Sequence, residues 1–202
     1  MVSAYYDELA GHPDPARAVG WESRPAQLAR YDFVAGLIRP GDRVLDLGAG
    51  LGDLGRHLAA RGAVDYVGLE REPTLLARGR AMSPTIDLRA ADFMADPWPE
   101  ADVVVAIGVL VDGASLRQDA VRFGRLRRLI ARMRTAHPRT AVLVALDQDL
   151  LERHPILSRE PALGGLRRAE QPWLAPDAAL HPPVGERLHP LLELDLALVM
   201  AR

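Results

Sequence analysis

The stretch Arg43-Val44-Leu45-Asp46-Leu47-Gly48-Ala49-Gly50-Leu51-Gly52 decides the fold. Its first half is an apolar run typical of a short buried strand. Three glycines then occupy every second position, and apolar residues with helical spacing resume at Leu54 and Leu58. Glycine permits a positive φ and lets a ligand approach bare backbone, and the N–H groups that open a helix favour polar or negative ligand groups. The stretch therefore predicts a strand, a ligand-binding glycine loop and a helix.

The glycine spacing alone leaves two registers open for a nucleotide-binding loop. The dinucleotide fingerprint G-x-G-x-x-G fails when counted from Gly48, because position 53 is an aspartate. Counted from Gly50, the pattern is met by Gly52 and Gly55, although Gly48 would then have no role. A P-loop is excluded, because it requires a lysine and the chain contains none.

A second acidic residue follows at a distance that suits a ribose. Residues 66–70 are predicted as the second strand, and Glu70 lies 20 positions after Gly50, which is the span of one strand-helix-strand unit. Such a unit would bring Glu70 beside the glycine loop, where a carboxylate can accept hydrogen bonds from both ribose hydroxyls.

A third feature is Asp92-Phe93, which follows a predicted strand at residues 86–90. An acid can accept a hydrogen bond from an adenine amino group while the neighbouring ring flanks the base. Other expected elements are a helix opening at Pro73, a strand at 101–109, a helix at 115–135 and strands at 141–146 and 193–200. This alternation predicts a Rossmann-like, doubly wound α/β fold with a seven-stranded, mostly parallel sheet and an antiparallel final strand.

These features, taken in order and with their spacing, resemble the class I S-adenosylmethionine-dependent methyltransferases over roughly residues 30–147. The resemblance implies a methyltransferase that uses S-adenosylmethionine as its cofactor. The glycines would cradle the methionine part, Glu70 would hold the ribose and Asp92 the adenine. The cofactor-binding residues it implies in this core are Gly48, Ala49, Gly50, Gly52, Glu70, Arg71, Asp92, Phe93, Ile107 and Gly108.

The segment ahead of the core carries a looser resemblance, to small bacterial methyltransferases of unassigned substrate. Its pattern is Tyr-Tyr-Asp, then Gly-Trp-x-Ser-Arg-x-x-Gln-x-x-Arg, and a helix at 21–38 is expected to end at Pro40-Gly41. The resemblance implies that Arg24 or Arg30 pairs with the methionine carboxylate of the cofactor, a group that an arginine fork suits. A surface arginine is the competing interpretation for each.

Three aromatic residues of this segment, Tyr5, Tyr6 and Trp21, stand out in a chain with ten aromatics in all. One interpretation makes them a lid over the cofactor and substrate, with Tyr6 among the cofactor-binding residues. The other makes them a packed N-terminal arm.

Composition limits the classes of function. The 202 residues predict one domain, divided into an N-terminal lid and helix (1–40), a cofactor-binding core (41–147) and a substrate-side segment with closing strands (148–202). A net charge of −2 predicts no general attraction to nucleic acid or membrane. The chain lacks cysteine, a signal peptide and a membrane-length apolar run, so we expect a cytoplasmic protein without a cysteine metal site. The resemblance to small bacterial methyltransferases implies a bacterial protein.

The methyl acceptor is the least readable part of the sequence. Enzymes of this class that methylate exocyclic amines of bases or glutamine amides carry Asn or Asp, Pro, Pro and an aromatic after the fourth strand, whereas this chain has Ile107-Gly108-Val109-Leu110. We therefore expect a small-molecule acceptor with an oxygen or nitrogen nucleophile. General-base candidates are Asp112, His154 and His181. The histidines lack metal-ligand spacing, so no metal site is predicted.

Two alternatives stay open. A non-catalytic module that keeps the cofactor pocket would show the same motifs. An NAD-dependent oxidoreductase is permitted by the second glycine register but lacks a recognisable catalytic set. The arginine-rich helix at 115–135 could contact RNA, but a solvated helix face fits better, because every basic residue in this chain is arginine.

Overall fold

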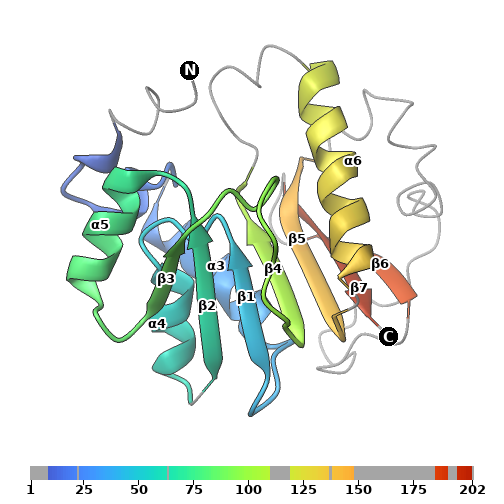
Figure 1. The fold of residues 1–202 in the computed structure, drawn as a ribbon, viewed down its shortest axis with the longest axis horizontal. Helices are drawn as coiled ribbons and strands as arrows, with labels where there is room; N and C mark the ends of the chain where they lie inside the picture. Colours follow the sequence, from blue (N-terminus) through green and yellow to red (C-terminus); the bar gives the residue numbers. More distant parts are fainter. Residues whose placement is uncertain are drawn as a thin grey trace.

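The computed structural model describes residues 9–21, 23–62, 64–109, 119–136, 138–147, 185–190 and 195–201. Helices and strands alternate along these residues (Figure 1). The helices are α2 (Pro15–Ala18), α3 (Arg24–Ala35), α4 (Asp53–Ala59), α5 (Pro73–Met82) and α6 (Asp119–Thr135). The strands are β1 (Arg43–Leu47), β2 (Asp65–Glu70), β3 (Asp87–Ala90), β4 (Val103–Ile107), β5 (Thr140–Asp147), β6 (Gly185–Pro190) and β7 (Asp195–Ala201).

The strands form one seven-stranded sheet in the order β3-β2-β1-β4-β5-β7-β6. Strands β1 to β5 are parallel, and β7 runs antiparallel between β5 and β6. The chain leaves β1 toward β2 on one side and returns to β4 on the other, so the strand order reverses between β1 and β4. Ligands of open α/β sheets bind outside the carboxyl ends of the strands at such a point. The predicted fold class is confirmed.

Helices cover both faces of the sheet. Alternate residues of the central strands point to opposite sides, so each face presents apolar side chains for helices to cover. On one face, Leu45 and Leu47 of β1 pack with Leu129, Ile130 and Met133 of α6. On the other face, Val44, Val103 and Val105 pack with residues of α3, α4 and α5. Figure 1 shows α6 in front of β5. The central strands are therefore buried on both sides, as their apolar sequences indicate.

Helix α3 begins after Ser23, within the segment 21–38 where a helix was expected, and it ends earlier than expected. The Ser23 hydroxyl accepts a hydrogen bond from the N–H of Ala26 at 3.3 Å, and a proline occupies the first turn. The prediction that the helix extends to Pro40 is wrong, because α3 ends at Ala35. The N–H groups of Leu37 and Ile38 bond carbonyls three positions back, so tight turns continue the apolar spacing without an α-helix.

Strand β6 was not expected from the sequence. Its residues, Gly-Glu-Arg-Leu-His-Pro, lack the alternating apolar pattern of a half-buried strand. Among the described strands it pairs with β7 alone, at the edge of the sheet, where polar residues and a terminal proline are tolerated. Among the described helices, none is long and apolar enough to cross a membrane.

Candidate active site

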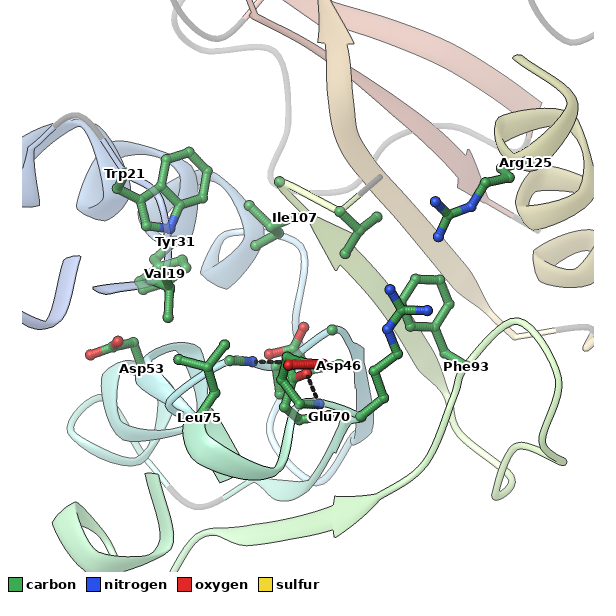
Figure 2. A pocket seen from close by; sticks show the side chains of 17 residues that line it. Val19, Trp21, Tyr31, Asp46, Asp53, Glu70, Leu75, Phe93, Ile107 and Arg125 are labelled. Atoms are coloured by element: carbon green, nitrogen blue, oxygen red, sulfur yellow. Dashed lines mark hydrogen bonds between the residues drawn. The ribbon is translucent and has the colours of Figure 1, made fainter. Parts of the chain in front are cut away.

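An open cavity of about 910 Å³, a volume that includes solvent at its mouth, lies at the carboxyl ends of β1, β2 and β4. Figure 2 shows Trp21 and Val19 on one side, Phe93 and Arg125 on the opposite side, and Asp46 and Glu70 between them. The cavity is lined by Val19, Trp21, Tyr31, Asp46, Gly48, Ala49, Gly50, Asp53, Glu70, Arg71, Glu72, Leu75, Phe93, Ile107, Gly108, Val109 and Arg125.

The glycine loop after β1 is shaped by backbone contacts. The N–H groups of Gly48 and Ala49 both donate to the carbonyl of Leu69 at 2.9 Å, which holds the loop against the end of β2. Gly48 has φ 75°, and a Cβ there would lie 2.7 Å from Cγ1 of Val109. The loop therefore needs glycine at this position both for its backbone angle and for its closeness to the β4 side of the cavity.

Glu70 lies beside the loop, as its spacing predicts. Its Oε2 accepts the N–H of Gly50 and its Oε1 accepts the N–H of Glu72, both at 2.8 Å (Figure 2). Burial raises the pKa of the Glu70 carboxyl, and the backbone N–H groups of Glu72 and Gly50 oppose that shift. Each carboxylate oxygen has a second lone pair, so Glu70 can still accept hydrogen bonds from a ligand.

Asp46, at the end of β1, lines the cavity and was missed as a site residue. It is 4% exposed, and its Oδ2 accepts the hydroxyl of Tyr66 at 2.6 Å. Burial raises the pKa of Asp46 to about 7; the Tyr66 hydrogen bond lowers it and the charge of Glu70 raises it. The signal that could have found Asp46 is a carboxylate in a buried strand two positions before the first glycine of the loop.

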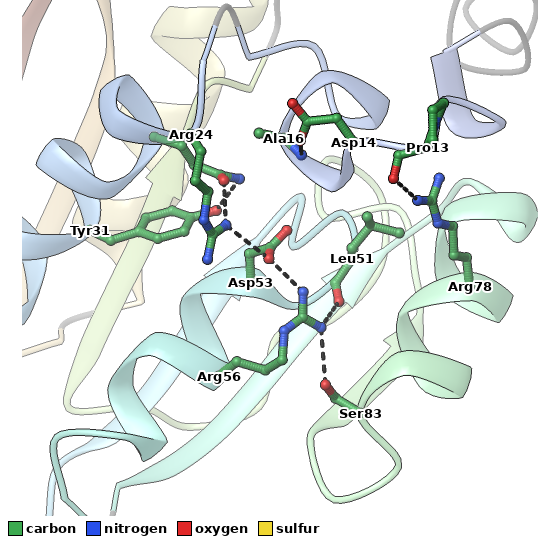
Figure 3. A network of polar contacts seen from close by, with 11 residues as sticks. Pro13, Asp14, Ala16, Arg24, Tyr31, Leu51, Asp53, Arg56, Arg78 and Ser83 are labelled. Carbon is green, nitrogen blue, oxygen red and sulfur yellow. Dashed lines mark hydrogen bonds and ion pairs between the residues drawn. The ribbon is translucent and has the colours of Figure 1, made fainter.

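Arg24 lies next to the cavity in a polar network with Asp53 (Figure 3). Its Nη1 donates to Oε1 of Gln27 at 2.6 Å and to Oδ1 of Asp53 at 3.1 Å. Nη2 of Arg56 reaches the same Asp53 oxygen at 2.5 Å. Among the residues that the structure describes, the buried Oδ2 of Asp53 has no hydrogen-bond partner. Nε2 of Gln27 donates to the hydroxyl of Tyr31 at 2.8 Å. Arg24 is thus bound within the protein, and its predicted pairing with the cofactor carboxylate stays a prediction.

Arg30, the other predicted carboxylate ligand, is not among the cavity-lining residues. Its Nη1 donates to the carbonyl of Ala26 at 2.6 Å, and its guanidinium lies 4.5 Å from the ring centroid of Trp21. Arg30 therefore supports the ring of Trp21. That ring lies against Gly108, where an added Cβ would be 3.0 Å from it.

Of the two residues predicted to contact the adenine, one lines the cavity. Phe93 lines the cavity, but Asp92 does not. Oδ1 of Asp92 accepts the N–H of Met94 at 2.8 Å, and Oδ2 lies 3.6 Å from Nη1 of Arg71, which does line the cavity. Asp92 therefore caps its own turn and positions Arg71, and its role as an adenine ligand stays a prediction.

Eight of the predicted cofactor-binding residues line the cavity: Gly48, Ala49, Gly50, Glu70, Arg71, Phe93, Ile107 and Gly108. Gly52 does not; its φ is 75°, and it packs beside Leu88. Outside the described residues lie Tyr5, Tyr6, Asp112, His154 and His181. Cavity residues that the sequence did not single out as ligands include Val19, Tyr31, Asp46, Asp53, Leu75 and Arg125.

Known proteins share both the sequence pattern and the fold. Residues 44–133 match a family model described as a methyltransferase domain. A protein-L-isoaspartate O-methyltransferase of Methylorubrum extorquens is 42% identical over 83 residues, which cover 39% of this chain. The chain spans 36% of that curated relative's length, so the reaction of the whole protein is a separate question.

Two solved structures resemble almost the whole chain. A TehB-like methyltransferase from Corynebacterium glutamicum has a TM-score of 0.59 at 17% identity and covers 98% of each chain. Magnesium protoporphyrin IX methyltransferase from Synechocystis PCC 6803, solved with S-adenosylmethionine, has a TM-score of 0.53 at 14% identity, covering 97% of this chain and 88% of that one.

The family match and the shared fold confirm the predicted class of enzyme. Residues 44–133 carry a methyltransferase domain, and the fold is that of class I S-adenosylmethionine-dependent methyltransferases, whose cofactor is S-adenosylmethionine.

Proposed function

We propose that this protein transfers the methyl group of S-adenosylmethionine to a small molecule with an oxygen or nitrogen nucleophile, in the cavity above the glycine loop. The observation that carries this proposal is the pairing of bare glycine backbone with a buried carboxylate. A Cβ at Gly48 or Gly50 would lie within 2.9 Å of a neighbouring side chain, and Glu70 is bonded to Gly50 itself.

The residues present fit this cofactor. The loop from Gly48 to Gly50 would hold the methionine part, since its backbone is open to the cavity. The two oxygens of Glu70 would accept the ribose hydroxyls. Arg71 and Phe93 would flank the base, because both line the cavity beyond Glu70.

Bound S-adenosylmethionine supplies an electrophilic methyl group, so the chain mainly aligns the reactants and excludes water. Val19 and Trp21 form one wall of the cavity, and Ile107 and Val109 line its β4 side. These apolar side chains would keep water away from the sulfonium. Asp112, His154 and His181 remain candidates for a general base if the acceptor must lose a proton.

Two features of the cavity favour a small acceptor. It is concave, and its lining combines apolar walls with a few polar groups, as is typical of small-molecule sites. Arg125 lines it opposite Trp21, so the space beyond the cofactor combines an aromatic wall with a basic group (Figure 2). The relative from Methylorubrum extorquens is named for a protein acceptor, so a peptide containing L-isoaspartate belongs in the test as the competing acceptor.

The cofactor assignment is tested by calorimetric titration with S-adenosylmethionine and NAD. We expect binding of S-adenosylmethionine and none of NAD. Glu70→Ala should weaken S-adenosylmethionine binding by roughly 1–3 kcal/mol, the usual cost of losing hydrogen bonds to a charged group. Glu100→Ala, at a carboxylate that is 90% exposed, is the matched control and should bind like the wild type. Unchanged affinity in a folded Glu70→Ala variant would refute the ribose assignment.

Transfer is tested with methyl-labelled S-adenosylmethionine against a panel of small hydroxy and amino compounds and an L-isoaspartyl peptide. Label on a small molecule supports the proposal. Label on the peptide alone overturns the acceptor class, and tight binding without transfer to any acceptor favours a non-catalytic module.

A further inference from the structure

Three buried carboxylates, Asp46, Asp53 and Glu70, line the cavity, and their surroundings differ. Asp53 is paired with Arg24 and Arg56, and Glu70 accepts two backbone N–H groups. Asp46 accepts the neutral hydroxyl of Tyr66 and, within the described part of the chain, has no ion pair. Among these three buried carboxylates, Asp46 is therefore the one whose charge the protein compensates least.

Within the described part of the chain, none of the elements packed around Asp46 pairs a cation with its carboxylate. Strand β2 contributes Tyr66 and Glu70, α3 contributes Tyr31, and α4 contributes Asp53, so the nearby ionisable groups are acids or phenols. Strand β4 opposes Asp46 with Val105 and consists of apolar residues. The cations near the cavity lie elsewhere: Arg24 is paired with Asp53, Arg71 follows β2 next to Asp92, and Arg125 is on α6.

The Tyr66 hydroxyl is placed by two glycines. A Cβ on Gly68, the register partner of Asp46, would lie 3.0 Å from that hydroxyl, and one on Gly55 would lie 2.6 Å from the Tyr66 ring. The absence of side chains at both positions lets the phenol reach Asp46 in the interior. The contact between Tyr66 and Asp46 thus depends on four positions on β1, β2 and α4.

We infer that Asp46 makes the cavity discriminate between the two charge states of the cofactor, favouring the cationic sulfonium over the neutral thioether by giving up its proton when the sulfonium binds. This inference rests on the proposed function. It assigns Asp46 a role in substrate selection and product release, in addition to any packing role.

The physical basis is the linkage between a buried acid and a nearby cation. With a pKa of about 7 in the ligand-free protein, Asp46 is partly protonated near neutral pH. A sulfonium in the same cavity favours the carboxylate, so binding releases a proton to solvent. During transfer the methyl–sulfur bond breaks, its electron pair stays on sulfur and the methyl group bonds to the acceptor. The sulfur then carries no charge, and Asp46 takes up a proton again, which weakens the hold on the product.

The sign of the pH dependence follows. Affinity for S-adenosylmethionine should rise as pH increases toward the ligand-free pKa of Asp46 and level off above it. Affinity for S-adenosylhomocysteine should lack this rise. One group with a pKa near 7 changes the ratio of the two affinities by at most about tenfold between pH 6 and 8.

The test is calorimetry of both ligands on the full chain from pH 6 to 8, in two buffers of different ionisation enthalpy. For the wild type we expect proton release on binding S-adenosylmethionine and a severalfold rise in the affinity ratio. Asp46→Asn should abolish both the proton release and the rise in the affinity ratio. Any proton exchange by the ionisable groups of the ligand itself should be the same in both proteins. Asp53→Asn removes a carboxylate that is already paired with two arginines. Its ratio of affinities for the two ligands should change with pH as in the wild type, even if its affinity for S-adenosylmethionine differs.

Tyr66→Phe gives a second, directional readout. It removes the hydrogen bond that lowers the pKa of Asp46, so the rise in the affinity ratio should move to higher pH. A wild-type affinity ratio that does not change with pH, or an Asp46→Asn variant that keeps the wild-type slope, would overturn the inference and leave the proposed function standing. Failure of the wild type to bind S-adenosylmethionine at all would overturn both.

Discussion

Asp46 lines the ligand cavity but lowers the free energy of unfolding when it is ionised. A buried carboxylate is costly to ionise, and its principal hydrogen-bond donor here is one phenol. Its pKa is about 7 in the folded protein against an ordinary value of 3.8, so the folded state binds the proton more tightly than the unfolded state between those values. Stability contributed by protonated Asp46 is therefore lost as pH rises through this window, and the loss is complete above it.

At this scale we predict that Asp46→Asn is stabilising at high pH. Relative to the wild type, its free energy of unfolding should improve by about 2–3 kcal/mol between pH 5 and 8, from 1.36 kcal/mol per pKa unit. Urea unfolding at several pH values measures this. Asp102→Asn is the control, because the hydrogen bonds from Arg43 lower the pKa of Asp102 and its effect should not change over this range. A constant difference for Asp46→Asn would show that Asp46 does not titrate there.

At the scale of elements, the loop between β1 and α4 is held in place from outside. Leu69 on β2 accepts two of its N–H groups, Glu70 accepts a third, and Val109 after β4 fills the space beside Gly48. The loop conformation thus depends on β2 and β4 as much as on its own glycines. This explains why a glycine pattern by itself leaves the register open.

We predict that Gly48→Ala destabilises the protein by roughly 1–3 kcal/mol and lowers S-adenosylmethionine affinity at least tenfold, since it adds both backbone strain and a 2.7 Å contact. Gly41→Ala separates the two effects. Gly41 has φ 85°, and a Cβ added there would meet nothing within 4 Å, so this substitution should cost stability but not affinity. Thermal unfolding and ligand titration of both variants check this, and equal affinity losses would contradict it.

At the scale of the whole molecule, residues 9–21 join the two sides of the cavity. Nη1 of Arg78 on α5 donates to the carbonyls of Ala10 at 2.6 Å and His12 at 2.7 Å, while Val19 and Trp21 contact the loop and the end of β4. Trp21 therefore lies where the lid interpretation places it, while Arg78 holds the backbone of Ala10 and His12. Tyr5 and Tyr6 lie outside the described residues.

We predict that Arg78→Met, which keeps the length of the side chain but removes its donors, loosens this segment. Losing hydrogen bonds from a charged group should cost roughly 1–3 kcal/mol of stability, and S-adenosylmethionine affinity should fall severalfold. Arg89→Met, at a half-exposed arginine paired with Asp87 on β3, is the control. Urea unfolding, ligand titration and limited proteolysis within residues 9–21 measure the effect. Wild-type affinity in Arg78→Met would mean that the segment only packs.

Local spacing in the sequence was enough to predict the fold and half of the site. Gly48, Gly50 and Glu70 belong to one strand-helix-strand unit, whose geometry places residues 20 positions apart side by side. The apolar strands and helix starts follow from the same short-range patterns. Helix ends and edge strands were less readable, because turns extend the apolar spacing after Ala35 and the edge strand β6 needs no apolar face.

Only the tertiary structure decided which charges meet. Arg24 and Asp53 are 29 residues apart, and their pairing depends on how α3 packs against α4. Trp21 reaches Gly108 because the N-terminal segment crosses to the end of β4. The environment of Asp46 likewise depends on a phenol from β2 and on burial inside the folded protein. The sequence by itself therefore determined the fold class and the cofactor, whereas desolvation and long-range side-chain contacts, which spacing does not encode, set the electrostatics of the cavity.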